Sequence, residues 1–175
     1  MLFGLVGSEM CIRDRRKILN NKVAIILGSN NDLKHAKPCV EILKKLKITH
    51  EVLIVSAHRT PKRMFEFAVS AEKKGFGVIC AFAGMSAHLA GMVSSLTTLP
   101  VLGVPVESKK LKGLDSLLSM VMMPKGVPIG CLAIEGGFNA GLLAASIIGN
   151  YDEKIKSNLN KWRRLQTQSV KKKPR

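Results

Sequence analysis

The chain has 175 residues, of which 46% are hydrophobic, 23% charged and 5% aromatic. This length suits one domain with a substantial core, and the composition excludes a disordered chain. No apolar stretch reaches the length of a membrane span without a glycine, proline or polar interruption, so we expect a soluble protein without membrane contact.

The net charge of +16 invites a nucleic-acid interpretation. Many of the basic residues fall into runs at 13–17, 44–47 and 171–175, and few aromatic side chains are available to stack on bases. No zinc-finger, RNP or basic-zipper pattern is present. We therefore expect no nucleic-acid partner and interpret the lysines as a solvated surface. The four cysteines lack the paired spacing of a zinc or redox motif, which favours a metal-free protein of the reducing cytoplasm.

Residues 1–21 differ in character from the rest of the chain. Residues 5–15 read LVGSEMCIRDR, which resembles the translation of a sequencing-library adaptor fused upstream of a gene. We expect residues 1–21 to be a disordered extension that arose as an assembly artefact, and it is too short and too polar for a secretory signal. Residues 22–170 are expected to form one α/β domain, and residues 171–175 a basic tail.

Short apolar runs alternate with helical patterns along most of the chain. Strands are predicted over 23–27, 51–55, 78–83, 100–106 and 129–134. The first three of these are expected to be buried. Helices are predicted over about 33–47, 61–74, 114–122 and 140–148, with a further helix after the turn at 84–91. This alternation predicts a doubly wound parallel sheet of strand order 2-1-3-4-5 with helices on both faces.

Two local features qualify the helices. Pro38 should kink the first helix or mark a later start, and Gly75 should end the helix 61–74 in a left-handed conformation. Residues 152–170 predict a polar helix with one narrow apolar stripe. Such a helix docks on another surface, and the periodicity fits its own domain and a neighbouring subunit equally well. We expect it to pack on a neighbouring subunit.

Three turns rich in small residues follow predicted strands, at 28–29, 56–58 and 84–86. In the predicted strand order these strand ends are neighbours at the switch point of the sheet, where ligands bind. The first turn leads into a helix and offers backbone N–H groups and the Ser29 hydroxyl to a phosphate. The three turns are therefore expected to share one crevice.

His58 and Arg59 lie between a strand and a helix start that Thr60 and Pro61 mark. A titratable imidazole beside a fixed cation suits proton transfer on an anionic substrate. Considered alone, His58 also fits an ordinary hydrogen-bonded surface residue, and the convergence of the three turns favours the functional interpretation. His88 fits a ligand contact and a cap for backbone groups equally well.

Five motifs occur together: GSNND at 28–32, SAHRTP at 56–61, AHLAGM at 87–92, TTLPVLGVPVES at 97–108 and GLDSLLSMVMMPKGVPIG at 113–130. In combination they resemble the N5-carboxyaminoimidazole ribonucleotide mutase family of purine biosynthesis, over about residues 23–170. The resemblance implies a flavodoxin-like three-layer α/β/α fold and a cytoplasmic homo-octamer with active sites at subunit interfaces. It implies a ribonucleotide substrate, no metal and no organic cofactor. The reaction would move a carboxylate from the exocyclic amine of the substrate to ring carbon four.

The resemblance also assigns roles to individual residues. His58 would be the general acid–base, and Arg59 would bind the substrate phosphate. Ser29 and Asp32 would hold the phosphate and the ribose hydroxyls. The residues that would close over the base and the migrating carboxylate are Gly84, Ser86 and His88, and Gly28 and Ser56 complete the expected substrate-binding set.

The sequence departs from the family pattern near the third turn. Phe82, Met85 and Ser86 replace glycine and alanine and are expected to narrow the pocket, and the loop at 135–139 is shorter than usual. Two other functions remain open. One is an aminoimidazole ribonucleotide carboxylase that uses free carbon dioxide on the same fold. That group typically lacks the motifs Arg-Thr-Pro and Ala-His-Leu, which this sequence has at 59–61 and 87–89, so these motifs favour the mutase. The other is a non-catalytic nucleotide- or nucleic-acid-binding homologue.

Overall fold

The structure, a computed structural model, describes residues 20–173. Most of the expected extension at 1–21 and the last two residues of the basic tail lie outside the described residues. Asn20 and Asn21 contact the domain, because the Tyr151 hydroxyl donates to the Asn20 carbonyl (3.1 Å) and the Asn21 amide donates to Asp152 (3.2 Å). Both asparagines therefore belong with the folded domain.

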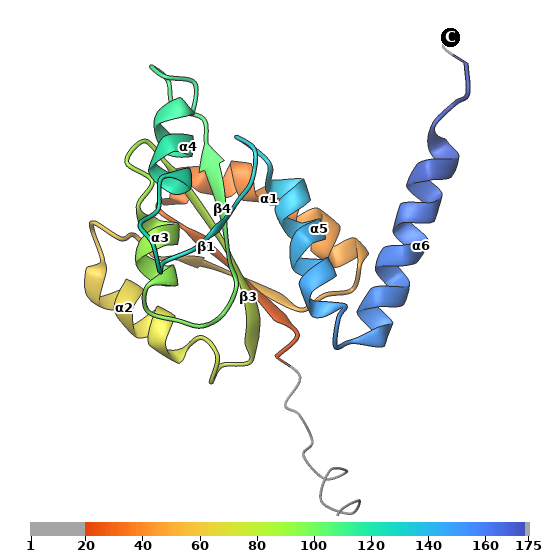
Figure 1. Cartoon of the computed structure of the whole chain (residues 1–175), viewed down its shortest axis with the longest axis horizontal. Helices are drawn as coiled ribbons and strands as arrows, with labels where there is room; N and C mark the ends of the chain where they lie inside the picture. Colours follow the sequence, from red (N-terminus) through yellow and green to blue (C-terminus); the bar gives the residue numbers. More distant parts are fainter. Residues whose placement is uncertain (1–19, 174–175) are drawn as a thin grey trace, which may run out of the picture.

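A five-stranded parallel sheet forms the middle layer (Figure 1). Its strands are β1 (Lys22–Leu27), β2 (His50–Ile54), β3 (Phe76–Gly84), β4 (Val101–Val106) and β5 (Gly130–Cys131). They pair in the order β2-β1-β3-β4-β5, every pair in parallel. The predicted strand order and the flavodoxin-like α/β fold are confirmed.

Helices cover both faces of the sheet, in two groups (Figure 1). The group on one face comprises α2 (Pro61–Ser70), α3 (Leu89–Ser94) and α4 (Leu114–Val121). The group on the other face comprises α1 (Leu33–Lys45), α5 (Gly137–Ile148) and α6 (Glu153–Ser169), with a single 3-10 turn, η1 (Asn30–Asp32), before α1. Each crossover between parallel strands therefore carries a helix, as parallel pairing requires.

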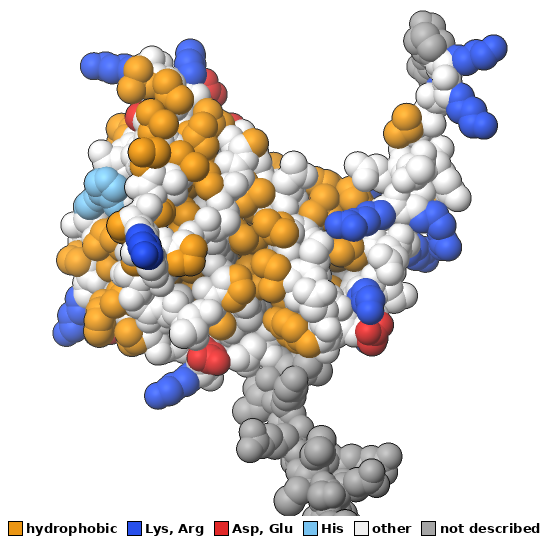
Figure 2. All heavy atoms as spheres, in the orientation of Figure 1, with side chains coloured by type: hydrophobic (Ala, Val, Ile, Leu, Met, Phe, Trp, Pro, Cys, Tyr) orange, Lys and Arg blue, Asp and Glu red, His pale blue; other side chains and the backbone are white. Residues whose placement is uncertain are grey.

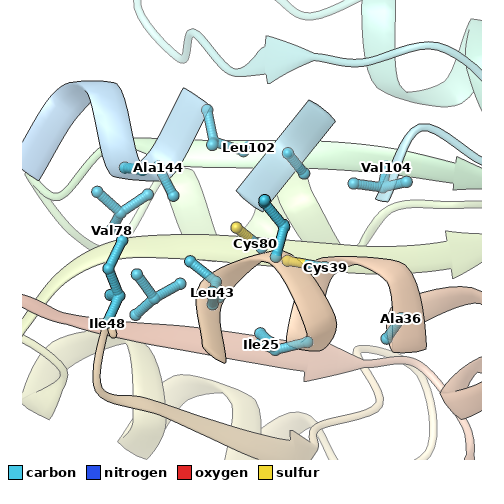
Figure 3. Close-up of a cluster of buried hydrophobic side chains, with 14 of the residues drawn as sticks. Ile25, Ala36, Cys39, Leu43, Ile48, Val78, Cys80, Leu102, Val104 and Ala144 are labelled. Carbon is cyan, nitrogen blue, oxygen red and sulfur yellow. The ribbon is translucent and has the colours of Figure 1, made fainter. Parts of the chain in front are cut away.

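Two apolar layers lie between the sheet and its helices. In β1, Ile25 faces α1 and α5 (Figure 3), whereas Ala24 and Ile26 face the opposite layer, because successive side chains of a strand point to opposite faces.

The thiols of Cys39 and Cys80 lie side by side in the layer under α1 and α5 (Figure 3). Their hydrogen bond and complete burial raise the pKa of the Cys80 thiol, so this thiol stays protonated and unreactive.

β2 is an edge strand and not the buried strand that its apolar residues predict. Val52 and Ile54 are 37% and 44% exposed, and Glu51 pairs with Lys22 of the neighbouring strand (2.5 Å). An edge strand has a neighbour on one side only, so more of its surface reaches solvent.

β5 spans two residues, whereas the sequence predicts a strand over 129–134. The chain beyond it continues beside β4 through single hydrogen bonds, from Leu132 N to Gly103 O (2.8 Å) and from Glu135 N to Pro105 O (2.9 Å). These two hydrogen bonds are not regularly spaced, so the β-pairing with β4 ends at Cys131. They still hold the segment up to Glu135 beside β4.

The helix bounds also differ from the prediction. α1 begins at Leu33 and continues through Pro38, so the proline does not delay its start. α2 ends at Ser70, four residues before the predicted end, and Gly75 has the predicted left-handed conformation (φ 83°). α5 begins at Gly137, ahead of the predicted start.

α6 packs on its own domain through its first turns. Ile155 and Leu159 are each 5% exposed, and the Trp162 ring contacts Phe138 with ring centroids 5.8 Å apart. Leu165 is 52% exposed, and the end of α6 extends away from the domain (Figure 1). Own-domain packing therefore accounts for the first part of the apolar stripe.

Among residues 20–173, no helix combines the length and the apolar character that crossing a membrane requires.

Asp152 caps α6 and links it to the start of β1. Its carboxylate accepts from the backbone N–H groups of Lys154 (3.0 Å) and Ile155 (3.1 Å) and from the side chain of Asn21 (3.2 Å). The hydrogen bond from Asn21, followed by those from the backbone, lowers the pKa of Asp152. Because the pKa is lowered in the folded state, this stabilisation is present at neutral pH and is lost as the pH falls through the lowered pKa.

Asp152→Ala should lower the free energy of unfolding by about 1 kcal/mol at neutral pH, because an uncapped helix start leaves backbone N–H groups unpaired. Urea denaturation should show a smaller difference from wild type at a pH below the lowered pKa of Asp152. Asp152→Asn, which still caps the helix, is the control. An equal loss at both pH values would contradict a contribution from the charge.

Candidate active site

A cavity of about 500 Å³ opens at the carboxyl ends of β1 and β3, beside the turn that follows β2. Its walls are Gly28, Ser29, Asn31, Asp32, Ser56, Ala57, His58, Arg59, Ala83, Gly84, Met85, Ser86 and Leu89. All the predicted site residues except His88 line it, and His88 contacts His58. The three turns therefore share one cavity, which we call the inner cavity.

Ser29 and Asp32 close the first turn by a reciprocal capping arrangement. One Asp32 carboxylate oxygen accepts from the Ser29 backbone N–H (2.8 Å) and from the Ser29 hydroxyl (3.1 Å), and the Asp32 N–H donates to the Ser29 carbonyl (3.2 Å). Asp32 is 9% exposed. In this arrangement Asp32 orients the Ser29 hydroxyl at the cavity wall.

Arg59 is held across the first and second turns. Its guanidinium donates to the Gly28 carbonyl (2.8 Å), and its Nε and backbone N–H both donate to the Ser56 hydroxyl (3.3 Å each). Ser56 is itself fixed, because its N–H donates to the Thr60 hydroxyl (3.0 Å) and its carbonyl accepts from that hydroxyl (3.0 Å). A permanent positive charge therefore faces the cavity in a defined orientation, which suits a phosphate.

His58 and His88 form a pair of contacting imidazoles. His58 Nε2 lies 3.0 Å from His88 Nδ1, and the two rings are nearly perpendicular (84°) with centroids 5.1 Å apart. One nitrogen of such a pair donates and the other accepts, so the tautomer of His58 depends on that of His88. His88 is the N-cap residue of α3, but its side chain makes no capping hydrogen bond there. Its side chain thus serves the pair with His58 and not the helix.

Phe82 does not narrow the cavity, contrary to the prediction. Its ring is fully buried on the side of α1 and α5. Gly137 packs closely against the ring there, since a Cβ atom at position 137 would lie only 3.1 Å from it. The neighbouring residue Ala83 faces the cavity instead, because side chains alternate along β3. Met85 and Ser86 do line the cavity, Met85 with a left-handed backbone (φ 57°).

A second cavity of about 1240 Å³, here called the outer cavity, shares the Ser29 and Met85 walls of the inner one. One of its sides is the start of α1, and another is the loop at 107–111. Sequence reasoning missed these walls. Their side chains include Lys34, His35, Lys37, Lys109 and Lys110. In the sequence these residues form ordinary helical and loop charges, and no local signal indicates that they face one another.

The walls offer groups for anion binding and proton transfer: an anchored guanidinium, a hydroxyl beside backbone N–H groups, and the imidazole of His58, which His88 contacts from outside the cavity lining. Within residues 20–173, no three His, Cys, Asp or Glu side chains are grouped so as to hold a metal ion.

A family model described as AIR carboxylase matches residues 22–169. The chain belongs to the AIR carboxylase family. Relatives that bear the name N5-carboxyaminoimidazole ribonucleotide mutase cover most of it. The protein from Escherichia coli K12 is 50% identical over 151 residues, which are 85% of this chain and 89% of the relative. The protein from Saccharolobus solfataricus is 53% identical over 141 residues, which are 81% of this chain and 89% of the relative.

Among solved structures, the crystal structure of Treponema denticola PurE matches with a TM-score of 0.75 at 27% identity, covering 84% of this chain and 92% of that chain. The relationship that the five motifs predict is thereby confirmed, and this chain shares its fold with the Treponema denticola protein.

Arg59→Gln should weaken the binding of ribose 5-phosphate about tenfold, because a hydrogen bond to a charged partner is worth about 1.5–3 kcal/mol. Isothermal titration calorimetry measures the dissociation constant. Arg63→Gln is the matched control, since Arg63 lies one turn further on, donates to the Ile54 carbonyl (3.3 Å) and does not line the inner cavity. Equal affinity of Arg59→Gln and wild type would show that Arg59 does not hold the phosphate.

Proposed function

We propose that this member of the AIR carboxylase family is an isomerase that converts N5-carboxyaminoimidazole ribonucleotide to 4-carboxy-5-aminoimidazole ribonucleotide in purine biosynthesis. The relatives at about 50% identity carry the mutase name. The observation that carries the proposal is the contact between His58 and His88 in the same cavity as Arg59 and Ser29. It unites a proton carrier with groups that suit a ribonucleotide phosphate.

His58 is the general acid–base of the proposed reaction. The bond between the exocyclic nitrogen and the carboxylate breaks, its electron pair stays on nitrogen, and protonated His58 gives nitrogen a proton as carbon dioxide leaves. Ring carbon four then attacks carbon dioxide, and neutral His58 takes the proton that carbon four sheds. One proton moves from carbon to nitrogen, and His58 returns to its starting state.

The proposed roles of the other residues follow from the need to keep carbon dioxide beside carbon four. Arg59 and Ser29 bind the phosphate, so binding energy far from the reacting atoms holds the ring still. Ala57 and Gly84 are small enough to let the base approach the wall closely. His88 contacts Nε2 of His58 and so sets the orientation and tautomer of the imidazole that transfers the proton.

A carboxylase that adds free carbon dioxide to aminoimidazole ribonucleotide is the second candidate, and the description of the matching family, AIR carboxylase, favours it. The inner cavity would serve both reactions, since both place a carboxylate on the same ring carbon. The mutase is preferred because the relatives with the mutase name are similar over almost the whole domain.

We also propose that the protein is a cytoplasmic homo-octamer. The side chains of an apolar α4 face are each about half exposed or more in the single chain, and hydrophobic side chains gather over α4 in Figure 2. The α4 face consists of Leu111, Leu114, Leu118, Val121 and Met122. Monomeric proteins rarely expose such a patch, which supports its burial against another subunit. It adjoins the inner cavity, because the Ser119 hydroxyl of α4, which donates to the Asp115 carbonyl (2.7 Å), lies 3.4 Å from the carbonyl of Met85 in the cavity wall.

His58→Asn should reduce turnover of N5-carboxyaminoimidazole ribonucleotide by about a hundredfold or more, because asparagine cannot carry the proton. Binding of ribose 5-phosphate should stay close to wild type. His50→Asn is the matched control. His50, at the start of β2, contacts the Ile48 carbonyl and does not line the inner cavity. Retained activity in His58→Asn would contradict the acid–base role.

The same assay separates the candidate functions. A mutase converts the carboxylated nucleotide without added bicarbonate, whereas a carboxylase converts aminoimidazole ribonucleotide only when bicarbonate is raised. No turnover of either nucleotide, together with intact binding, would identify a non-catalytic homologue.

Leu118→Glu should lower the oligomeric mass seen by sedimentation velocity, because a carboxylate on the α4 face cannot be buried without a partner. Wild type should sediment as an octamer. Lys73→Gln, at an exposed position after α2, lowers the net charge by the same one unit and is the control. An unchanged mass in Leu118→Glu would place the subunit contact elsewhere.

A further inference from the structure

Glu135 adopts an unusual backbone conformation in the loop between β5 and α5. Its φ is 59°, in the left-handed region that favours glycine. Gly136 and Gly137 follow it directly, yet the left-handed position itself carries glutamate. A strained residue of this kind persists where its surroundings hold it in place, which is frequent at functional sites.

Both carboxylate oxygens of Glu135 have partners from distant parts of the chain. Oε1 accepts from the backbone N–H of Glu107 (2.7 Å), and Oε2 lies 2.5 Å from Nδ1 of His35. The backbone N–H of Glu135 donates to the Pro105 carbonyl (2.9 Å). The side chain of His35 is 17% exposed and that of Glu135 is 37% exposed, so the pair is partly shielded from water.

These contacts join two walls of the outer cavity. His35 lies in the first turn of α1, close after the Ser29 turn, and Glu107 begins the loop that forms the opposite wall. Gly113, at the far end of that loop, packs against Ile134, the residue before Glu135. The two are so close that a Cβ atom at position 113 would lie 2.7 Å from Ile134 Cγ2. Both ends of the 107–113 loop are therefore held by residues 134 and 135.

We propose that Glu135 is a positioning residue for the substrate: it holds the 107–113 loop against α1, so that the outer cavity keeps the shape that receives the ribonucleotide. The proposal rests on the function proposed above. Glu135 lines neither cavity and acts through Glu107 and His35, so it influences binding and not the proton transfer by His58.

Glu135→Gly tests this role because it separates stability from binding. Glycine removes the strain of the left-handed residue together with the two carboxylate contacts, so the melting temperature should change little. The KM for the carboxylated nucleotide should rise about tenfold while kcat stays within about twofold, as expected when binding alone is weakened. Glu135→Gln keeps an oxygen for the Glu107 N–H and should restore most of the affinity.

Lys47→Gly is the matched control. Lys47 has the same φ of 59°, follows the end of α1, and its exposed side chain lines neither cavity. This substitution should raise the melting temperature by relieving the same strain and leave KM and kcat unchanged.

Hydrogen exchange supplies a readout that needs no substrate. The Glu107 amide should exchange faster in Glu135→Gly than in wild type and Lys47→Gly, because its acceptor is lost. Unchanged exchange would overturn the link between the two walls. Faster exchange with unchanged KM would overturn the positioning role, while wild-type turnover would still support the proposed function. A parallel loss of stability and kcat would show that Glu135 serves only the fold.

Discussion

The parallel register of β1 with its two neighbours is the constraint on which the site depends. Leu27, the last residue of β1, lies opposite Ile54 of β2 on one side and Phe82 of β3 on the other. The carboxyl ends of neighbouring parallel strands lie at the same edge of the sheet, so the turns that follow them lie close together. The hydroxyl of Ser29 and the imidazole of His58 thus meet in one cavity although the chain separates them by a strand and a helix.

Within that cavity, hydrogen bonds fix the polar groups before any ligand arrives. Arg59 is tied to the Gly28 carbonyl and Asp32 to the Ser29 hydroxyl, so the anion-binding groups need little reorganisation on binding. The imidazole of His58 meets a single nitrogen of His88. Such preorganisation suits the proposed proton transfer, in which one acid–base group must reach nitrogen and carbon in turn.

Two of the departures expected from the sequence, Phe82 and the loop at 135–139, lie close together in the structure. Phe82 fills the space beside Gly137 in the layer under α5, where a larger residue at 137 would also approach the His35 carbonyl to 2.9 Å. The loop before α5 is short, and Glu135 within it contacts α1 and the end of β4. A bulky side chain in β3 and a compact loop before α5 are thus complementary, and the Phe82 ring takes no space from the cavity on the other face of β3.

The sequence alone predicted the alternation of strands and helices, the strand order, the three turns and the family. It could do so because hydrophobic periodicity, turn residues and motifs are properties of neighbouring residues. The tertiary structure alone decided that Val52 and Ile54 of β2 are exposed, that the Phe82 ring points away from the cavity, and that His58 meets His88. It also joined His35 to Glu135, across 100 residues of chain. Such contacts depend on how whole layers pack and on which face each side chain takes, and no local pattern encodes that geometry.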